Sequence, residues 1–211
     1  MSIVKTFIVT KYGGVPVRNY QYYDFFAGGG MAGCGLGSNW TCLFANDIDQ
    51  RKAKAYKDNH NGGKEFHLGD VGEVRPDQLP QRADLAWASF PCQDLSLAGS
   101  GAGLKGNRSG TFWPFWNLIR ELDADNRSPH IIALENVFGA LTSHKGRDFA
   151  AIADAIVGLG YRFGAIVIDA VHFVPQSRPR LFVVAVKSDL NLPHDLQTTL
   201  PNTSWHPPAL L

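Results

Sequence analysis

The chain has 211 residues and a mass of 23.1 kDa, enough for one globular domain with a hydrophobic core. Hydrophobic residues make up 45% and charged residues 18%, which argues against a disordered, collagen-like or coiled-coil protein. The 20 Lys and Arg residues nearly balance the 19 Asp and Glu residues, so any nucleic-acid site must be a local patch.

The first 20 residues are interpreted as an N-terminal extension, whose alternating apolar and polar side chains indicate a short strand or hairpin. Between residues 21 and 188, apolar runs of strand length alternate with helical stretches. Strands are predicted near residues 22–26, 41–46, 65–68, 83–89, 130–135, 162–168 and 181–186. Helices are predicted near 31–38, 50–59, 111–123 and 147–159, the last ended by Gly160. Residues 189–211 form a Pro-rich tail.

This alternation predicts an α/β fold with a mostly parallel, seven-stranded sheet and helices on both faces. In such sheets, ligands bind at the carboxyl ends of the strands, so functional residues are expected in the loops that follow them. The Gly-rich residues 96–110 form either a loose surface connection or a mobile loop beside a site.

The cysteines and the apolar runs indicate the compartment. Cys34, Cys42 and Cys92 are odd in number and lack zinc-type spacing, which argues against a disulfide framework and a metal site. The sequence has neither a signal-peptide pattern nor an apolar run of about 18 residues. We therefore expect a cytoplasmic protein in a reducing compartment, with no membrane contact and no metal.

A glycine turn follows the first predicted strand after residue 20. Gly28, Gly30 and Gly33 fit the GxGxxG pattern, which lets a nucleoside-containing ligand approach the backbone. A tight turn with close helix-to-strand packing is the alternative. Asp47 ends the next strand, where a carboxylate can accept the hydroxyl groups of a ribose, whereas Asp49 is better placed to cap the following helix.

Two reactive side chains follow later strands. Cys92 ends the fourth strand beside the Gly-rich loop, the position of a nucleophile, whereas Cys34 and Cys42 suit buried, inert positions within apolar patterns. Glu135 ends the next strand after a run of apolar residues. It is either a solvated or capping residue or, if buried, a proton donor whose pKa is raised by burial.

In order and spacing, the chain from about Tyr22 to Val186 resembles the DNA (cytosine-5) methyltransferases. The segments that carry the resemblance are Asp24-Phe-Phe-Ala-Gly-Gly-Gly, Asn46-Asp-Ile-Asp, Gly69-Asp-Val, Pro91-Cys-Gln, Glu135-Asn-Val and Gln176-Ser-Arg-Pro-Arg. Six segments in register are far more specific than any one of them. The resemblance implies a Rossmann-like fold, S-adenosylmethionine as cofactor and S-adenosylhomocysteine as product.

The resemblance also assigns roles to residues. The cofactor would contact Asp24, Phe26, Gly28, Gly30, Asp47, Ile48, Asp70, Val71 and Pro91. The catalytic residues would be Cys92, Glu135, Arg178 and Arg180, and the substrate would contact Phe90, Gln93 and Asn136.

The implied reaction makes chemical sense of these residue types. Cys92 would add to C6 of cytosine while Glu135 protonates N3, so that C5 becomes nucleophilic enough to take a methyl group. The two arginines would contact O2 of the base and brace the acid. The cytosine must be flipped out of the DNA duplex, and residues 96–110 would close over it, with Lys105 and Arg108 near phosphates. The sequence does not identify the base that removes the C5 proton.

The chain departs from the family pattern in three places: Met31 replaces a glycine, Ile48 replaces an aromatic residue, and Pro179 separates the two arginines. None of these changes removes a reacting group. The family continues beyond the arginines with a target-recognition domain and further motifs, whereas only residues 181–211 follow Arg180. We therefore expect a catalytic region truncated before that domain, with the recognition part on a second chain or lost.

Other functions remain open at this point. The chain could be a catalytically silent or partner-dependent fragment of such an enzyme, or a tRNA cytosine-5 methyltransferase with the same motifs. An NAD-dependent dehydrogenase is disfavoured, because it needs neither the Pro-Cys-Gln nor the Glu-Asn-Val segment. The sequence does not tell whether the enzyme belongs to a restriction-modification system.

Overall fold

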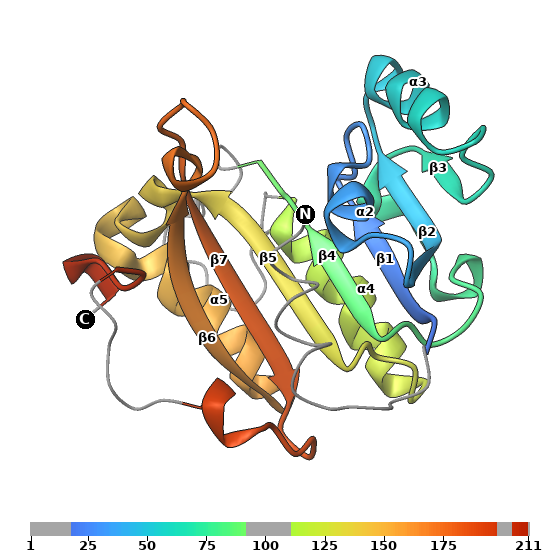
Figure 1. Ribbon diagram of the computed structural model, residues 1–211. Coiled ribbons are helices and arrows are strands. Elements are labelled where there is room, and N and C mark those ends of the chain that lie inside the picture. Colours follow the sequence, from blue (N-terminus) through green and yellow to red (C-terminus); the bar gives the residue numbers. More distant parts are fainter. Residues whose placement is uncertain (1–17, 92–110, 198–203, 211) are drawn as a thin grey trace.

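The computed structural model describes residues 18–91, 111–197 and 204–210 (Figure 1). These residues form one seven-stranded sheet with the strand order β3-β2-β1-β4-β5-β7-β6. The predicted N-terminal strand or hairpin within residues 1–17 lies outside the described residues, as does the whole Gly-rich segment 96–110.

The observed elements follow the predicted alternation. The strands are β1 Tyr20–Phe25, β2 Trp40–Asp47, β3 Phe66–Leu68, β4 Leu85–Ala88, β5 Ile131–Val137, β6 Tyr161–Asp169 and β7 Pro179–Lys187. The α-helices are α2 Met31–Leu36, α3 Gln50–Asn59, α4 Phe112–Ala124 and α5 Arg147–Gly158. Gly160 has a φ of +76° just after α5, the left-handed conformation that favours glycine at a helix end.

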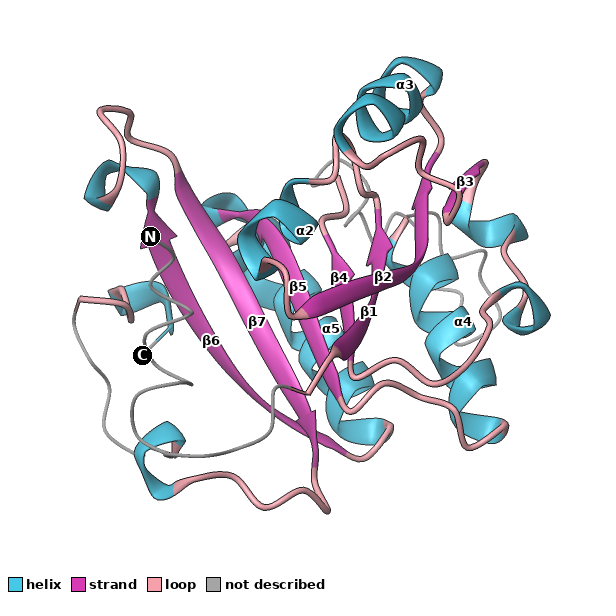
Figure 2. Ribbon diagram, turned by 45° about the vertical axis from the view of Figure 1, so that its right-hand side comes forward, coloured by secondary structure: helices cyan, strands magenta, loops and turns pink. Residues whose placement is uncertain are grey.

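Helices cover both faces of the sheet, as predicted. On one face, α4 and α5 lie side by side behind β4, β5 and β7 (Figures 1 and 2). Phe115, Ile119 and Leu122 of α4 are fully buried there in the main core. On the other face, Leu36 of α2 packs against a smaller cluster around Tyr22. α3 lies on that face too, where its Tyr56 and Ala45 of β2 share a third cluster.

The direction of β7 decides what meets at the functional edge. β1, β2, β4 and β5 are parallel, so their carboxyl ends share one edge of the sheet. β7 pairs with β5 in the antiparallel sense, with Val137 opposite Arg180. The start of β7 therefore lies at the same edge as the end of β5. This antiparallel strand makes the sheet mostly rather than wholly parallel.

The described part of the Pro-rich tail returns to the sheet. The backbone N–H of Val167, in β6, donates a hydrogen bond of 2.8 Å to the carbonyl of Trp205. Leu210 packs at the margin of the main core. Among the described helices, none has the length and apolarity needed to cross a lipid bilayer.

Candidate active site

The glycine turn between β1 and α2 has two different sides. A Cβ atom on Gly30 would collide with the ring of His60, and one on Gly33 would collide with the hydroxyl group of Tyr22. A Cβ atom on Gly28 would meet nothing within 4 Å. Gly30 and Gly33 therefore allow close packing, as the tight-turn interpretation predicts, whereas a side of Gly28 faces open space.

Two buried carboxylates lie beneath this turn. The residues Asp24 and Asp47, near the ends of β1 and β2, are only 1% and 3% exposed. Asp47 accepts hydrogen bonds from the backbone N–H groups of Gly28, at 3.0 Å, and Asp49, at 2.9 Å. Lys52 lies 3.4 Å from the same carboxylate. The Oδ2 atom of Asp24 has no hydrogen-bond partner among the described residues.

Burial dominates the acidity of Asp24. Loss of hydration, with a smaller contribution from the charge of Asp47, raises the pKa of Asp24 to about 7. Of the two carboxylates, Asp47 is paired with Lys52, whereas Asp24 keeps an oxygen without a hydrogen-bond partner among the described residues. Hydroxyl or ammonium groups of a ligand would complete the hydrogen bonding of this pair, because both can donate to unpaired carboxylate oxygens.

Asp24 should make the stability of the protein fall as the pH rises. Its raised pKa in the folded state means that the folded protein binds this proton more tightly than the unfolded chain does. The contribution of Asp24 to the free energy of unfolding is most favourable below about pH 4. It is lost as the pH rises toward about 7, which lowers the free energy of unfolding by about 2–4 kcal/mol. Urea unfolding of wild type and Asp24→Asn at several pH values between these limits measures the difference.

The exposed carboxylate of Asp77, whose side chain is 70% exposed, provides the matched control for this experiment. Asp77→Asn should keep the wild-type pH dependence, whereas Asp24→Asn should flatten it. Parallel pH profiles for wild type and Asp24→Asn would show that Asp24 is not protonated preferentially in the folded protein.

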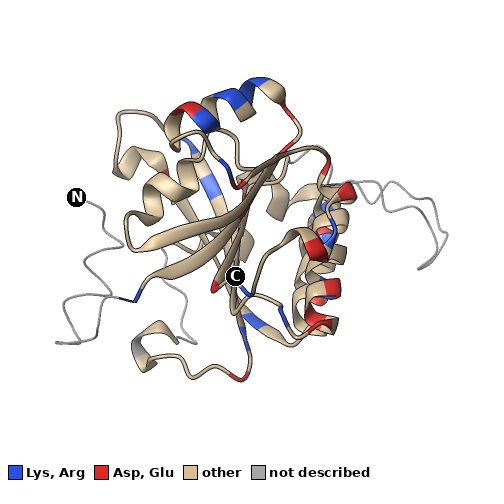
Figure 3. Cartoon of the chain, turned by 90° about the vertical axis from the view of Figure 1, so that its right-hand side faces the viewer, with Lys and Arg blue, Asp and Glu red and all other residues tan. Residues whose placement is uncertain are grey.

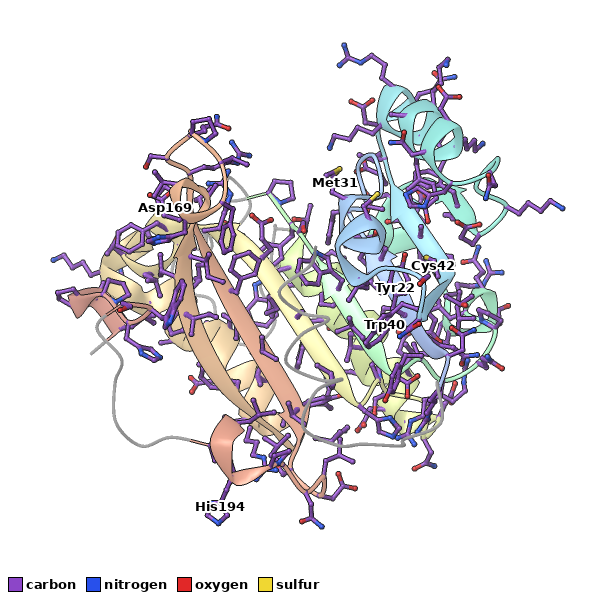
Figure 4. All side chains as sticks on the ribbon, in the orientation of Figure 1. Tyr22, Met31, Trp40, Cys42, Asp169 and His194 are labelled. Atoms are coloured by element: carbon purple, nitrogen blue, oxygen red, sulfur yellow. The ribbon has the colours of Figure 1, made fainter. Side chains whose placement is uncertain are left out.

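Exposed apolar side chains and a capping acid complete this half of the edge. Ile48 is 68% exposed and Met31 73% exposed, and Met31 projects outward from α2 (Figure 4). Asp70 caps the short 3-10 helix Val71–Glu73 by accepting from the N–H of Gly72 at 2.8 Å. The side chain of Val71 is buried in the core. Only the backbone of Val71 is therefore available to a ligand.

The capping prediction for Asp49 is confirmed, since its carboxylate accepts from Arg51 N at 2.7 Å and Lys52 N at 3.2 Å. The prediction that Cys34 is buried is wrong. Cys34 is exposed, because α2 has only six residues and buries none of them. Cys42 is half-buried beside Tyr22 (Figure 4), and burial raises its pKa to about 12.

The candidate acid is held by one of the two predicted arginines. The Nε atom of Arg180 lies 2.9 Å from Oε1 of Glu135, and the two side chains are only 19% and 23% exposed. The antiparallel pairing of β5 and β7 brings these residues together. Glu135 is therefore mostly buried, as the proton-donor interpretation requires, and its carboxylate pairs with a guanidinium on the face without α4 and α5.

Arg178 has a different environment. It is exposed and precedes β7, and its backbone N–H donates to Asp169 at 2.6 Å. Asp169 also accepts from Ser177 Oγ at 2.8 Å and from Val171 N at 3.1 Å, so it ties down the loop between β6 and β7 (Figure 4). Sequence reasoning missed Asp169, although an acid that ends an apolar strand is the same signal that identified Asp47.

Two residues predicted to bind substrate are buried instead. Asn136 is 5% exposed, and its Nδ2 donates to the carbonyl of Phe90 at 3.0 Å. Phe90 is 4% exposed and contacts Phe26, with ring centres 6.4 Å apart. These side chains therefore support the end of β4 from inside. Their contribution to a site is to fix the backbone that leads through Pro91 to Cys92.

Several predicted residues lie outside the described part of the chain, namely Cys92, Gln93, Lys105 and Arg108. Pro91, the last described residue before them, is exposed at the carboxyl end of β4, between β1 and β5. Within the described residues, no group of three or more His, Cys, Asp and Glu side chains could hold a metal ion. Lysines and arginines gather on the exposed side of α3 (Figure 3).

The fold and this edge define an α/β protein with a glycine turn, buried acids and an Arg-braced carboxylate at the carboxyl ends of its strands. Residues 20–209 match the family described as C-5 cytosine-specific DNA methylase. The chain belongs to this family.

Characterised relatives are similar over part of their length. The type II methyltransferase M.BsuFI of Bacillus subtilis is 31% identical over 173 residues, which are 81% of this chain and 40% of the relative. M.HhaI of Haemophilus parahaemolyticus is 27% identical over 82% of this chain and 50% of the relative. The crystal structure of S. pombe Dnmt2 has a TM-score of 0.66 at 20% identity, covering 82% of this chain and 52% of that one. The chain spans about half the length of the relatives it matches.

Proposed function

We propose that this chain is the catalytic region of a DNA (cytosine-5) methyltransferase, which transfers a methyl group from S-adenosylmethionine to C5 of a flipped-out cytosine. The ion pair between Glu135 and Arg180 carries the proposal. It lies at the edge where β4 ends before Cys92 and where the glycine turn opens. Family membership supports the same reaction.

The residues around the glycine turn fit S-adenosylmethionine. Gly28 offers an open backbone, and Asp47 keeps free lone pairs for ribose hydroxyls although both of its oxygens already accept hydrogen bonds. The exposed side chain of Ile48 would cover the adenine, and Asp70 would accept from its amino group. When bound, S-adenosylmethionine supplies an electrophilic methyl group, and S-adenosylhomocysteine is the product.

The chain's own residues would prepare the cytosine. The thiolate of Cys92 adds to C6 and forms an S–C6 bond, while protonated Glu135 donates its proton to N3. The electron pair of the C5–C6 double bond is thereby made available at C5. After C5 has been methylated, a base removes the C5 proton, the S–C6 bond breaks, and N3 returns its proton to Glu135. Arg180 keeps the carboxyl group oriented throughout.

Access to C5 and C6 requires the cytosine to leave the base stack, at a cost of a few kcal/mol. The exposed arginine Arg178 and the basic residues Lys105 and Arg108 are available to contact phosphates or the base. The chain would act in the cytoplasm, on DNA.

A second candidate is a half-enzyme that needs a partner chain with the target-recognition part. This chain spans 40% of M.BsuFI and 50% of M.HhaI, and a transfer assay decides whether it acts without a further chain. A tritiated-methyl transfer assay on mixed DNA and on tRNA, with and without lysate from the source cell, separates the possibilities. Transfer to DNA by the chain alone excludes the need for a partner, whereas transfer to tRNA only overturns the DNA substrate.

Asp47→Ala should weaken the binding of S-adenosylhomocysteine about tenfold or more. The substitution removes the acceptor for the ribose hydroxyls and also the hydrogen bond to Gly28 N, at 3.0 Å. Isothermal titration calorimetry on the full chain measures the affinity. Asp77→Asn, a change at an exposed carboxylate to which no role in the site is assigned, is the control; an unchanged affinity in Asp47→Ala would remove Asp47 from the site.

A further inference from the structure

The glycine turn is fastened to both ends of α3. At the beginning of α3, the N–H of Gly28 donates to Asp47, which lies two residues before the helix cap Asp49. At the end of α3, the Nδ2 atom of Asn59 donates to the carbonyl of Gly29 at 3.0 Å. The next glycine, Gly30, has a hydrogen bond to His60. Gly28, Gly29 and Gly30 thus each have one hydrogen bond to the segment formed by β2 and α3.

The His60 ring makes the third of these bonds and also supports the turn by packing. Its Nε2 lies 3.1 Å from the carbonyl oxygen of Gly30, so Nε2 carries the hydrogen that is donated. The ring stacks on Tyr56 with centres 4.4 Å apart and planes at 24°. Tyr56 is fully buried, so the ring rests on a rigid part of α3.

The turn needs such support because its backbone is unusual. Gly28 has a φ of +57° and Gly30 a φ of +82°, and glycines lose more conformational freedom on ordering than any other residue. An unsupported turn would sample other conformations, and a ligand would then lose affinity in ordering it. Hydrogen bonds to the carbonyl oxygens of Gly29 and Gly30 restrict rotation of the two peptide groups in the middle of the turn.

We propose that Asn59 and His60 are positioning residues, which hold the glycine turn in the conformation that receives the cofactor. This inference rests on the proposed function, because it assumes that the turn binds S-adenosylmethionine. Neither residue touches the open surface at Gly28. They act through the carbonyls of Gly29 and Gly30 from the end of α3.

The positioning role predicts a loss of affinity that exceeds the loss of stability. Asn59 is exposed, so the net contribution of its hydrogen bond to global unfolding is small. Asn59→Asp keeps the shape of the side chain, removes the donor and sets an acceptor against the carbonyl of Gly29. We expect its affinity for S-adenosylhomocysteine to fall roughly three- to tenfold.

Substitutions of His60 separate hydrogen bonding from packing. His60→Ala removes both the ring and the donor and should lower the affinity by a similar factor. His60→Gln restores an N–H donor near the place of Nε2 and should recover affinity to within about twofold of wild type. Lys54→Ala is the matched control on the same helix, because Lys54 is 78% exposed and its ammonium group pairs with Asp58 at 2.7 Å.

The experiment is calorimetric titration of S-adenosylhomocysteine into the full chain and these variants, together with hydrogen exchange of residues 26–33 without ligand. We expect faster exchange of this segment in Asn59→Asp and His60→Ala than in Lys54→Ala, with unchanged exchange in β1 and β4. Binding by wild type, weakened by Asp47→Ala but unchanged in Asn59→Asp and His60→Ala, would overturn the positioning role alone. Failure of wild type to bind would overturn the proposed function, and the positioning role with it.

Discussion

Cys92→Ser should lower methyl transfer by roughly 1,000-fold or more and should abolish covalent trapping on DNA that contains 5-fluorocytosine. Addition to C6 needs an anionic nucleophile, and a thiol ionises near neutral pH whereas a serine hydroxyl does not. The fluorine at C5 cannot be removed as a proton is, so the S–C6 adduct accumulates only when the thiolate can form it.

Cys34→Ser is the matched control for this prediction. Cys34 is exposed on α2, so the same chemical change there should leave trapping and cofactor affinity unchanged. Calorimetry with S-adenosylhomocysteine should show equal affinity for wild type and Cys92→Ser, which separates a chemical defect from misfolding. Trapping that persists in Cys92→Ser would exclude Cys92 as the nucleophile.

The sequence predicted the alternation of strands and helices because each buried strand leaves a continuous apolar run. The predicted strand at 130–135 corresponds to β5, Ile131–Val137, and the predicted helix at 50–59 to α3, Gln50–Asn59. The sequence could not fix the direction of β7, since an apolar run reads the same in a parallel and an antiparallel strand. That direction determines which arginine meets Glu135.

The site was less predictable than the fold because sequence position does not determine which way a side chain faces. Asn136 and Phe90 occupy motif positions, yet both are buried and support the backbone. Conversely, Asn59 and His60 lie in no motif named from the sequence, and only the packing of α3 brings them to the glycine turn. Contacts between segments 30 residues apart leave no local pattern.

Glu135→Gln should lower methyl transfer about 100- to 10,000-fold, because an amide cannot deliver a full proton to N3 of cytosine. The amide keeps the size of the side chain and can still accept from Arg180, whose Nε lies 2.9 Å from Oε1 in the wild type. Cofactor affinity should therefore stay unchanged. Single-turnover methylation, followed with tritiated S-adenosylmethionine, measures the chemical step.

Substitutions of the two arginines test whether Arg180 orients the carboxyl group of Glu135 or only places a positive charge near it. Arg180→Lys removes the planar, directed N–H group and should slow the same step, whereas Lys in place of Arg178 leaves the Glu135 contact intact. If Arg180 acts through Glu135, the loss in the double variant Glu135→Gln/Arg180→Lys will be smaller than the two single losses combined. Strict multiplication of the two losses would mean that Arg180 acts independently of the acid, for instance on the cytosine itself. Full activity of Glu135→Gln would remove protonation by this carboxyl from the reaction, because the amide in its place has no acidic proton to give to N3.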